Sequence, residues 1–314
     1  MNSGHCQWSD FDSSLIDGAG IYSFGIARLG AVGDIQDARY DSWISRACHG
    51  TMTYMERYRD IRHDPRLLLD GAHSMLCCAF SYYTPLSGTP DSLVIARYAL
   101  GKDYHDIVRQ RLETVAARIR AKYGGNTRVC VDTAPLHERY WAARAGIGVI
   151  GLNNQLIIPG AGSYFFLGEI ITTARIKPTA DIEIPPSCEQ CGRCVRECPV
   201  GALHPDGSCD TSRCLSYLTI EHRGEFAEGT DTHGHFYGCD RCAEVCPHNA
   251  NPPQCTIDDL KPNPGLLSLT ADKMLAMTHD EYVGLFRGSP MKRAKLTGLQ
   301  RNAMHLKNKQ TGEK

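Results

Sequence analysis

The alternation of apolar and polar residues predicts a long amphipathic helix over residues 103–122. Its apolar positions recur every three or four residues, so they fall on one face of a helix. That face is formed by Ile107, Leu112, Val115, Ala116 and Ile119. A second helix is predicted over residues 136–145, which contain a helix-forming run.

Apolar runs of β-capable residues predict strands between and around these helices. The predicted strands span residues 22–28, 75–83, 128–132, 155–158 and 164–172. Strands and helices therefore alternate along the first 180 residues. This order is typical of an α/β or α+β layered domain, in which helices cover a sheet. The pattern leaves the order of the strands open.

The cysteines divide the chain into regions. Ten of the 15 lie between residues 188 and 255. The other five, which we expect to be small buried hydrophobic residues, are Cys6, Cys48, Cys77, Cys78 and Cys130. The proline-containing segment 177–186 predicts a linker. We therefore predict a first domain over 1–180, a cysteine-rich domain over 181–262 and a C-terminal helical segment with a basic tail over 263–314.

Four cysteines follow one another in the spacing C-x2-C-x2-C-x3-C-P. They are Cys188, Cys191, Cys194 and Cys198. Bacterial ferredoxins hold [4Fe–4S] clusters with this run, and in two-cluster ferredoxins its fourth cysteine ligates the other cluster. Closely spaced thiolates on one loop can reach several corners of a cubane. The run therefore predicts one-electron transfer.

A second, partial run ends in Cys246-Pro247 and lacks a first cysteine of its own. Cys214 is the best candidate to complete it, although Cys209 or Cys255 could take its place. We assign one predicted cluster to Cys188, Cys191, Cys194 and Cys246, and the other to Cys198, Cys214, Cys239 and Cys242. Two clusters can supply a two-electron reduction one electron at a time.

Structural zinc and disulfide bonds are the other common uses of clustered cysteines. Zinc sites usually take two distant C-x2-C pairs, whereas these cysteines come in triplets with a trailing Cys-Pro. Disulfides require an oxidising compartment, and the first ten residues show neither the basic nor the apolar region of a secretory signal. No apolar stretch approaches the length of a membrane span. We expect a cytoplasmic, thiol-reduced protein.

A glycine-rich stretch lies beside a carboxyl group in the first domain. Gly146, Gly148 and Gly151 satisfy the dinucleotide pattern G-x-G-x-x-G, but a helix-forming run precedes them where a strand is needed. We expect a helix C-cap and a loop near a large or flat group instead. Asp132 ends a predicted strand close by. Partial burial there would raise its pKa and make it a proton donor, or Asp132 or Thr133 caps the following helix.

Further segments accompany these motifs along the chain. They are 64–66, 95–105, 132–139, 145–148, 151–153, 162–172, 214–221 and 288–293. Together with the two cysteine runs, and in this order over nearly the whole chain, they resemble the epoxyqueuosine reductase family. The combination is specific, although each piece alone is not. The chain departs from the family at Leu152, where a lysine is usual.

The resemblance implies an oxidoreductase that reduces epoxyqueuosine to queuosine in the anticodon loop of tRNA, with cobalamin and two [4Fe–4S] clusters as cofactors. It implies a cobalamin-binding first domain, a bacterial-type two-cluster ferredoxin domain after it, and Asp132 as the proton donor that epoxide opening needs. An external low-potential electron donor would reduce the clusters, and we expect a monomer. The expected cobalamin contacts are Arg97, Tyr98, Tyr104, His105, Asp132, Asn153, Asn154 and Ser163.

Charge adds one local feature. The formal net charge of −1 gives no general support for nucleic-acid binding. From residue 292 onward, however, basic residues far outnumber acidic ones. This stretch indicates either a solvated tail or a phosphate-contacting surface, and its candidate tRNA contacts are Lys292, Arg293 and Arg301.

Two other functions fit part of the pattern. A related cobalamin and iron–sulfur reductase of a small molecule, similar to a reductive dehalogenase, would use the same cofactors. The lack of a twin-arginine signal and the basic C-terminal stretch favour tRNA over that alternative. A corrinoid-binding electron carrier without turnover would need no proton donor at Asp132.

Overall fold

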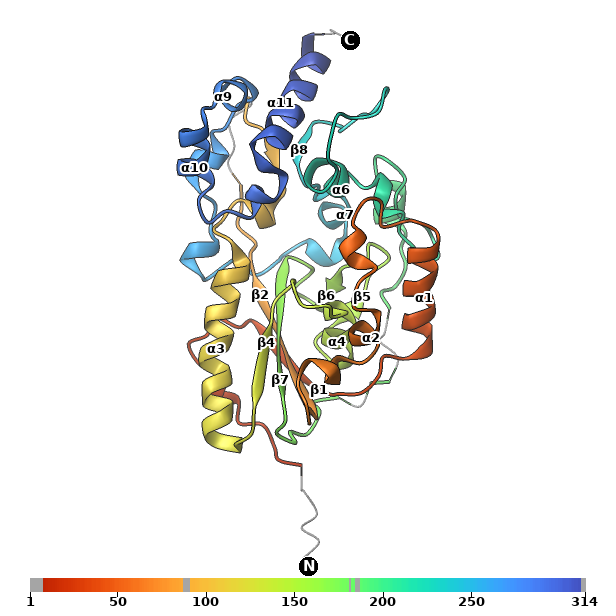
Figure 1. The fold of residues 1–314 in the computed structure, drawn as a ribbon, viewed down its shortest axis with the longest axis vertical. Helices are drawn as coiled ribbons and strands as arrows, with labels where there is room; N and C mark the ends of the chain where they lie inside the picture. Colours follow the sequence, from red (N-terminus) through yellow and green to blue (C-terminus); the bar gives the residue numbers. More distant parts are fainter. Residues whose placement is uncertain (1–7, 87–90, 181, 184–186, 312–314) are drawn as a thin grey trace, which may run out of the picture.

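The computed structural model describes residues 8–86, 91–180, 182–183 and 187–311 (Figure 1). Cys6, Lys314 and part of the predicted linker lie outside these residues. The first half is built on a four-stranded antiparallel sheet with the order β1–β2–β7–β4. These strands are β1 (Ser23–Arg28), β2 (Ser74–Ser81), β4 (Thr127–Cys130) and β7 (Phe165–Thr172).

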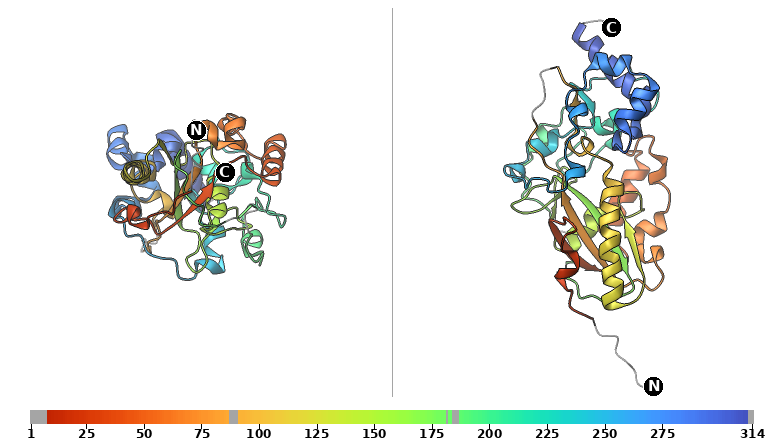
Figure 2. Two further views of the ribbon diagram at one scale, coloured as in Figure 1. Left: turned by 90° about the horizontal axis from the view of Figure 1, so that it is seen from below. Right: turned by 90° about the vertical axis from the view of Figure 1, so that its left-hand side faces the viewer.

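Helices cover both faces of this sheet. The helices of the first half are α1 (Asp34–Ser45), α2 (Arg59–His63), α3 (Tyr104–Tyr123) and α4 (Glu138–Arg144). On one face α3 places Leu112 and Val115 in a core with Leu76, and in the right-hand view of Figure 2 it runs in front of the sheet. On the other face α4 places Trp141 in a core with Met75. All eight residues of β2 are buried, because a central strand covered on both sides has no face open to water.

The predicted elements of the first half are confirmed, with ends shifted by one or two residues. The mixed α/β fold class is confirmed as well. The short strands β5 (Val149–Ile150) and β6 (Leu156–Ile157) form a separate small sheet. Helix α1 was not predicted from the sequence. Tyr40 is its one buried residue, so it lacks the apolar stripe by which such helices are recognised.

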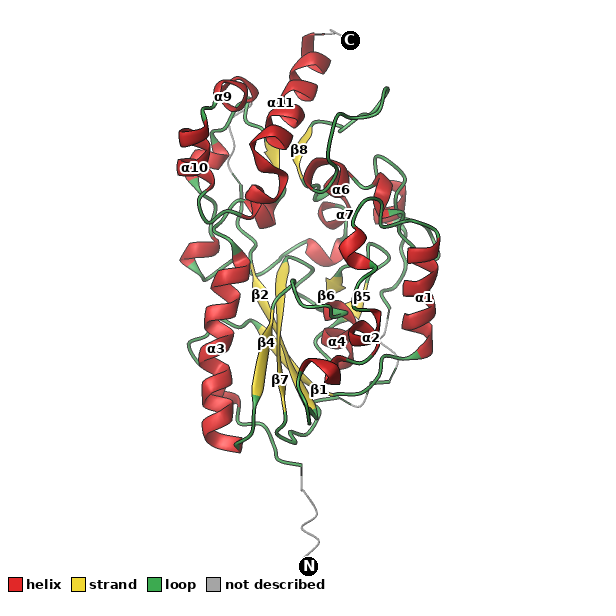
Figure 3. Cartoon of the chain, in the orientation of Figure 1, coloured by secondary structure: helices red, strands yellow, loops and turns green. Residues whose placement is uncertain are grey.

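The second half consists mostly of short helices and loops (Figure 3). Its helices are α5 (Arg193–Arg196), α6 (Leu215–Ile220), α7 (Arg241–Glu244), α8 (Pro264–Leu267), α9 (Ala271–Ala276), α10 (His279–Phe286) and α11 (Lys295–Thr311). In the described ranges, no helix combines the length and the apolar character that crossing a membrane requires.

A third core joins the two halves. Strand β3 (Val94–Ile95) pairs in parallel with β8 (His235–Tyr237). Ile95 thereby lies in one core with Phe236 and Met274. The domain boundaries at 180 and 262 remain predictions, and residues 94–100 pack with the two later segments. The start of the predicted linker is anchored too, because the Thr179 hydroxyl donates to the Ala145 carbonyl (2.6 Å).

Candidate active site and cluster cysteines

Asp132 lies where three elements meet, just after β4. Its carboxylate accepts a hydrogen bond from the Tyr104 hydroxyl (2.8 Å) and lies 2.9 Å from Nε2 of His105, both at the start of α3. Its backbone N–H donates to Oε1 of Glu138 (2.5 Å), the first residue of α4. Its φ of +51° is in the left-handed region, which is strained for a residue other than glycine. The loop thus holds one carboxylate in a fixed, strained position.

The alternative role of Asp132 as a helix cap is not observed. The residue at the N-cap of α4 is His137, and no side chain caps this helix. Instead the Glu138 carboxylate accepts from the backbone of Asp132. The side chain of Asp132 is therefore directed to Tyr104 and His105.

The structure reverses the expected direction of the Asp132 pKa. Burial raises it, as predicted, but hydrogen bonds from His105 and Tyr104 outweigh burial and hold this pKa below its usual value. Nδ1 of His105 also lies 2.7 Å from Asp103. Burial lowers the pKa of His105, yet its bonds to the two carboxylates raise it to about 9. At neutral pH the His105–Asp132 pair therefore holds one proton, and the imidazole carries it.

Asp132 is surrounded by protein and still reachable from solvent. Its side chain is 54% exposed, although burial is the largest single influence on its pKa. Beside it, the Tyr104 ring stacks on His105 (4.1 Å between centroids) and on Phe166 (4.2 Å, planes 5° apart). The Phe166 ring continues this row to Tyr82 (4.6 Å). A partly open aromatic wall with an acid at its edge suits a large planar ligand.

The described cysteines of the C-terminal half fall into two groups by their mutual electrostatic influence. After burial, the charges that raise the pKa of Cys194 are those of Cys246, Cys188 and Cys191. Burial raises the pKa of Cys239 to about 12, and the thiol charges acting on it are those of Cys214 and Cys198. Cys239 and Cys214 act in turn on Cys242, as does Cys194 of the first group to a smaller extent. These neighbourhoods are compatible with the two predicted ligand sets, which remain a prediction.

The two alternative candidates for the ligand position of Cys214, Cys209 and Cys255, differ in their surroundings. Cys255 is buried, and its thiol donates to the Ile257 carbonyl in the core beneath α3. Cys209 lies near Cys214 and Cys198, which raise its pKa after burial to about 11. In the described part of the chain no three Cys, His, Asp or Glu side chains converge to hold one ion. The thiolates of a cubane bind different irons and need no such convergence.

Four of the predicted cobalamin contacts also touch the cysteine-rich segment. The backbone N–H of Arg97 donates to Asp240 (2.7 Å), which stands between Cys239 and Cys242. The side-chain amide of Asn153 donates to the Cys242 carbonyl (3.5 Å). Asn154 likewise donates to the Gly207 carbonyl (3.2 Å), and the backbone N–H of Ser163 donates to Asn249 (2.7 Å). The remaining four gather at the aromatic wall, since Tyr98 contacts the Tyr104 ring edge-on.

The glycine-rich stretch is explained by packing within the protein. Gly146 has a φ of +81° just after the C-cap of α4, as a helix C-terminus requires. A Cβ on Gly148 would lie 2.3 Å from the Ile157 carbonyl of β6. The predicted C-cap is confirmed, and Gly148 allows the close approach of β6, while the expected position of the loop near a large flat group stays a prediction.

The three candidate tRNA contacts differ in how free they are. Lys292 is exposed, and its charge acts on Asp103 beside His105. Arg293 forms a double hydrogen bond with Glu221 (2.8 Å each). The guanidinium of Arg301 donates to three backbone carbonyls and lies 4.1 Å over the Phe226 ring. Arg301 therefore has a structural task, and Lys292 is the most available of the three.

Sequence reasoning missed two acidic residues. Glu169 is fully buried in β7, and in the described part of the chain neither of its carboxyl oxygens makes a hydrogen bond of ordinary geometry. Its signal was a single charged residue inside an apolar strand pattern. Glu138 bonds to the backbone of Asp132, and its role could not be read from the sequence because only the fold brings the two groups together.

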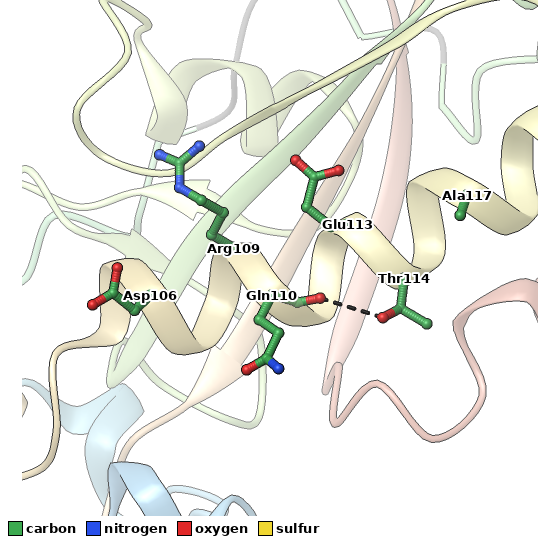
Figure 4. Close-up of a pocket in the computed structure, with 6 residues that line it drawn as sticks. All are labelled: Asp106, Arg109, Gln110, Glu113, Thr114 and Ala117. Carbon is green, nitrogen blue, oxygen red and sulfur yellow. Dashed lines mark hydrogen bonds between the residues drawn. The ribbon is translucent and has the colours of Figure 1, made fainter.

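Two hollows in the described surface lie away from Asp132. One of about 620 Å³ runs along the outer face of α3, where Arg109 and Glu113 point the same way from successive turns (Figure 4). Asp132 does not line it. Another of about 550 Å³ is lined by Cys246 together with Arg193, Arg196 and Arg241. Cys246, which belongs to the first predicted ligand set, therefore lies at the surface beside basic residues.

Two family models match the chain. The model described as "Epoxyqueuosine reductase QueG, DUF1730" matches residues 62–133. The model described as "4Fe-4S double cluster binding domain" matches residues 187–249.

Similar proteins cover most of the chain. An epoxyqueuosine reductase of Cellulophaga algicola is 33% identical over 92% of this chain and 94% of its own length. One of Gloeobacter violaceus is 36% identical, over 90% and 91%. A crystal structure of epoxyqueuosine reductase with an epoxyqueuosine-modified tRNA-Tyr stem loop has a TM-score of 0.85 at 29% identity, over 94% of this chain and 80% of that one.

Proposed function

The chain belongs to the epoxyqueuosine reductase family, and on this basis we propose that it reduces epoxyqueuosine to queuosine in the anticodon loop of tRNA. One observation supports this most strongly. A protonated His105–Asp132 pair stands at an aromatic wall, and the residues beside that wall bond directly to the segment that carries the cluster cysteines. Electron carriers and a proton source thus meet in one molecule.

Two electrons and two protons are needed to remove an epoxide oxygen as water. We assign one [4Fe–4S] cluster to Cys188, Cys191, Cys194 and Cys246, and the other to Cys198, Cys214, Cys239 and Cys242. This donor set fits because the thiols interact within these groups. When bound, such clusters pass single electrons at low potential. An external low-potential donor supplies these electrons. Cys191 is exposed, so the cluster of Cys188, Cys191, Cys194 and Cys246 is the one nearer to the surface.

Cobalamin fits the aromatic wall by the chemistry of the residues there. Tyr98, Tyr104 and His105 would hold it, with Asp132 facing the substrate side. When bound, it supplies a cobalt centre that can be strongly reduced. Arg97, Asn153, Asn154 and Ser163 hold the cysteine-rich segment against the wall, and so set how closely the two cofactor sites approach.

The His105–Asp132 pair supplies the first proton. Opening an epoxide leaves a negative charge on oxygen, and a positioned acid lowers the cost of that charge. The proton rests on His105, and Asp132 is the carboxylate through which it reaches the substrate oxygen. The substrate nucleoside must leave the base stack of the anticodon loop to come this close.

Phosphate contact by the basic segment gives a testable prediction. Replacing Lys292 and Arg293 by glutamate should weaken tRNA binding and flatten its salt dependence, because fewer counterions are released. Fluorescence anisotropy at several salt concentrations measures both effects. Lys122→Glu, at the far end of α3 from Asp132, is the matched control. Unchanged binding in the double variant would make the segment a merely solvated surface.

The alternative functions explain less of the molecule. If the protein reduced a small molecule, the exposed Lys292 beside the site would have no binding role. If it were a corrinoid-binding carrier, the His105–Asp132 pair would have no catalytic role. A tRNA substrate and reduced thiols place the protein in the cytoplasm, and we expect it to act as a monomer.

Expression in cells that accumulate epoxyqueuosine tests the function. In a bacterium that lacks its own reductase, this chain should restore queuosine in bulk tRNA, as measured by nucleoside mass analysis. A chain with serine at Cys239 and Cys242 should not. Epoxyqueuosine that persists despite full expression of cluster-loaded protein would contradict the proposal.

A further inference from the structure

Glu169 is a carboxyl group enclosed by the sheet. It is 0% exposed and pairs in register with Cys77 of β2 and Cys130 of β4. Among the described residues neither of its oxygens makes a hydrogen bond of ordinary geometry, although the Glu138 side chain influences it as a hydrogen-bond partner. A buried carboxylate without a partner is so costly that the group takes up a proton instead. Burial, followed by the charges of Glu138 and Asp132, raises the pKa of Glu169 well above its usual value.

Glu138 connects this buried group to Asp132. Its Oε1 accepts from the Asp132 backbone (2.5 Å), and its charge acts on Glu169. Burial and the Asp132 charge raise the pKa of Glu138 to about 8. At neutral pH both glutamates therefore hold protons next to an ionised Asp132.

The groups around the two glutamates do not compensate for a negative charge. Arg139 on α4 and His105 on α3 lower the pKa of Glu138 only as smaller influences. On the sheet side the neighbours are thiols. Burial raises the pKa of Cys77 and Cys78 well above the usual value and that of Cys130 to about 12, so all three are neutral at pH 7. The carboxyl groups of Glu138 and Glu169 are therefore both protonated and uncharged at pH 7.

The reaction needs one proton more than the His105–Asp132 pair holds. Opening the epoxide breaks one C–O bond, and the oxygen takes the first proton. Breaking the second C–O bond releases that oxygen as water with a second proton, while the two electrons from the external donor complete the alkene. Substrate bound against the exposed side of Asp132 would limit the access of water there, which favours a second proton source within the protein.

We propose that Glu169 and Glu138 form a relay that delivers the second proton to Asp132. The inference rests on the proposed function. Glu138 contacts Asp132 through the backbone N–H of that residue, so delivery of the proton requires the Glu138 carboxyl to turn toward the Asp132 carboxylate. Glu138 then takes the next proton from Glu169, which it influences as a side-chain hydrogen-bond partner. Solvent restores the relay through Asp132 after the products leave.

Neutral amides at the two positions test the relay. Glu138→Gln and Glu169→Gln keep the shape of the side chain but cannot pass a proton on. Each should lower the rate of queuosine formation about tenfold or more, whereas Glu113→Gln, on the outer face of α3, should not. The wild-type rate should fall as pH rises through about 8, where Glu138 loses its proton, and Glu138→Gln should lack that decline. A purely structural role would leave the pH profile unmoved.

Two measurements on the full chain need no turnover. Infrared spectra at pH 7 should show the C=O stretch of a protonated carboxyl that Glu169→Gln loses. The stability of the wild type should fall as pH rises from about 4.5 through about 8, because the folded protein binds these protons more tightly than the unfolded chain. Glu169→Gln should flatten that fall.

The outcomes separate the relay from the function. If the wild type forms queuosine and both amide variants match its rate and pH profile, the relay is wrong and the function stands. A carboxylate at Glu169 at pH 7 would also overturn the relay. If fully loaded wild type forms no queuosine, the proposed function fails and the relay has no reaction to serve.

Discussion

Asp132→Asn should lower the rate of queuosine formation by about 10²- to 10⁴-fold, the range expected for removal of a positioned acid. Asparagine keeps the size of aspartate and can accept the hydrogen bond from Tyr104, but it cannot carry a proton to the substrate. The pKa of His105 should fall as well, because Asp132 is one of the two carboxylates that raise it. The variant therefore loses both the proton held on His105 and the carboxylate through which that proton reaches the substrate.

Binding should be spared in this variant. Cobalamin titration followed by absorbance, and tRNA affinity, should match the wild type, since the carboxylate contributes charge rather than shape. Asp106→Asn, an exposed position on α3, is the matched control and should keep full activity. Single-turnover assays separate the chemical step from product release. A variant at Asp132 with near wild-type single-turnover rates would show that another group protonates the oxygen.

Cys214→Ser should lower the iron content from about eight atoms per chain to about four, since two cubanes hold eight and this change removes a ligand of one. Its thiol acts on Cys239 and on Cys242, as a ligand of the same cluster would. Queuosine formation with an external donor should then stop, because the route for electrons is cut. Iron analysis after anaerobic reconstitution measures the first effect.

Two neighbouring cysteines provide the controls. Cys255→Ser should keep about eight irons, because Cys255 lies in the core beneath α3. Cys209→Ser should keep them too, although Cys209 lies near Cys214 and Cys198. If Cys209→Ser loses half of the iron and Cys214→Ser keeps it, the two residues exchange roles. If both keep it, the second ligand set is wrong.

The sequence predicted the main strands and helices because they carry periodic burial. Helix α3 shows its apolar stripe openly, and β2 is an unbroken apolar run because both of its faces are covered. Helix α1 was missed because it buries little. The cysteine spacings were readable because two short runs supply seven of the eight predicted ligands, while the link from Cys214 to the second run depends on long-range folding.

The direction of the Asp132 pKa could not be predicted from its position on a strand end. Burial alone raises it, and that part of the prediction holds. The opposing influence comes from Tyr104 and His105, which lie 28 and 27 residues away in the sequence. Only the packing of α3 against the sheet reveals them. The same long-range packing places Asn153 and Ser163 against the cysteine-rich segment.

The most direct test of the account is one reaction with purified protein. The protein is first loaded anaerobically with iron, sulfide and cobalamin. It is then mixed with a low-potential reductant and tRNA that contains epoxyqueuosine. The nucleosides of the tRNA are finally separated and identified by mass spectrometry. The account predicts that epoxyqueuosine is replaced by a nucleoside lighter by one oxygen, and that omission of cobalamin or use of Asp132→Asn prevents the change. Epoxyqueuosine that remains intact with protein shown to hold both clusters and cobalamin would contradict it.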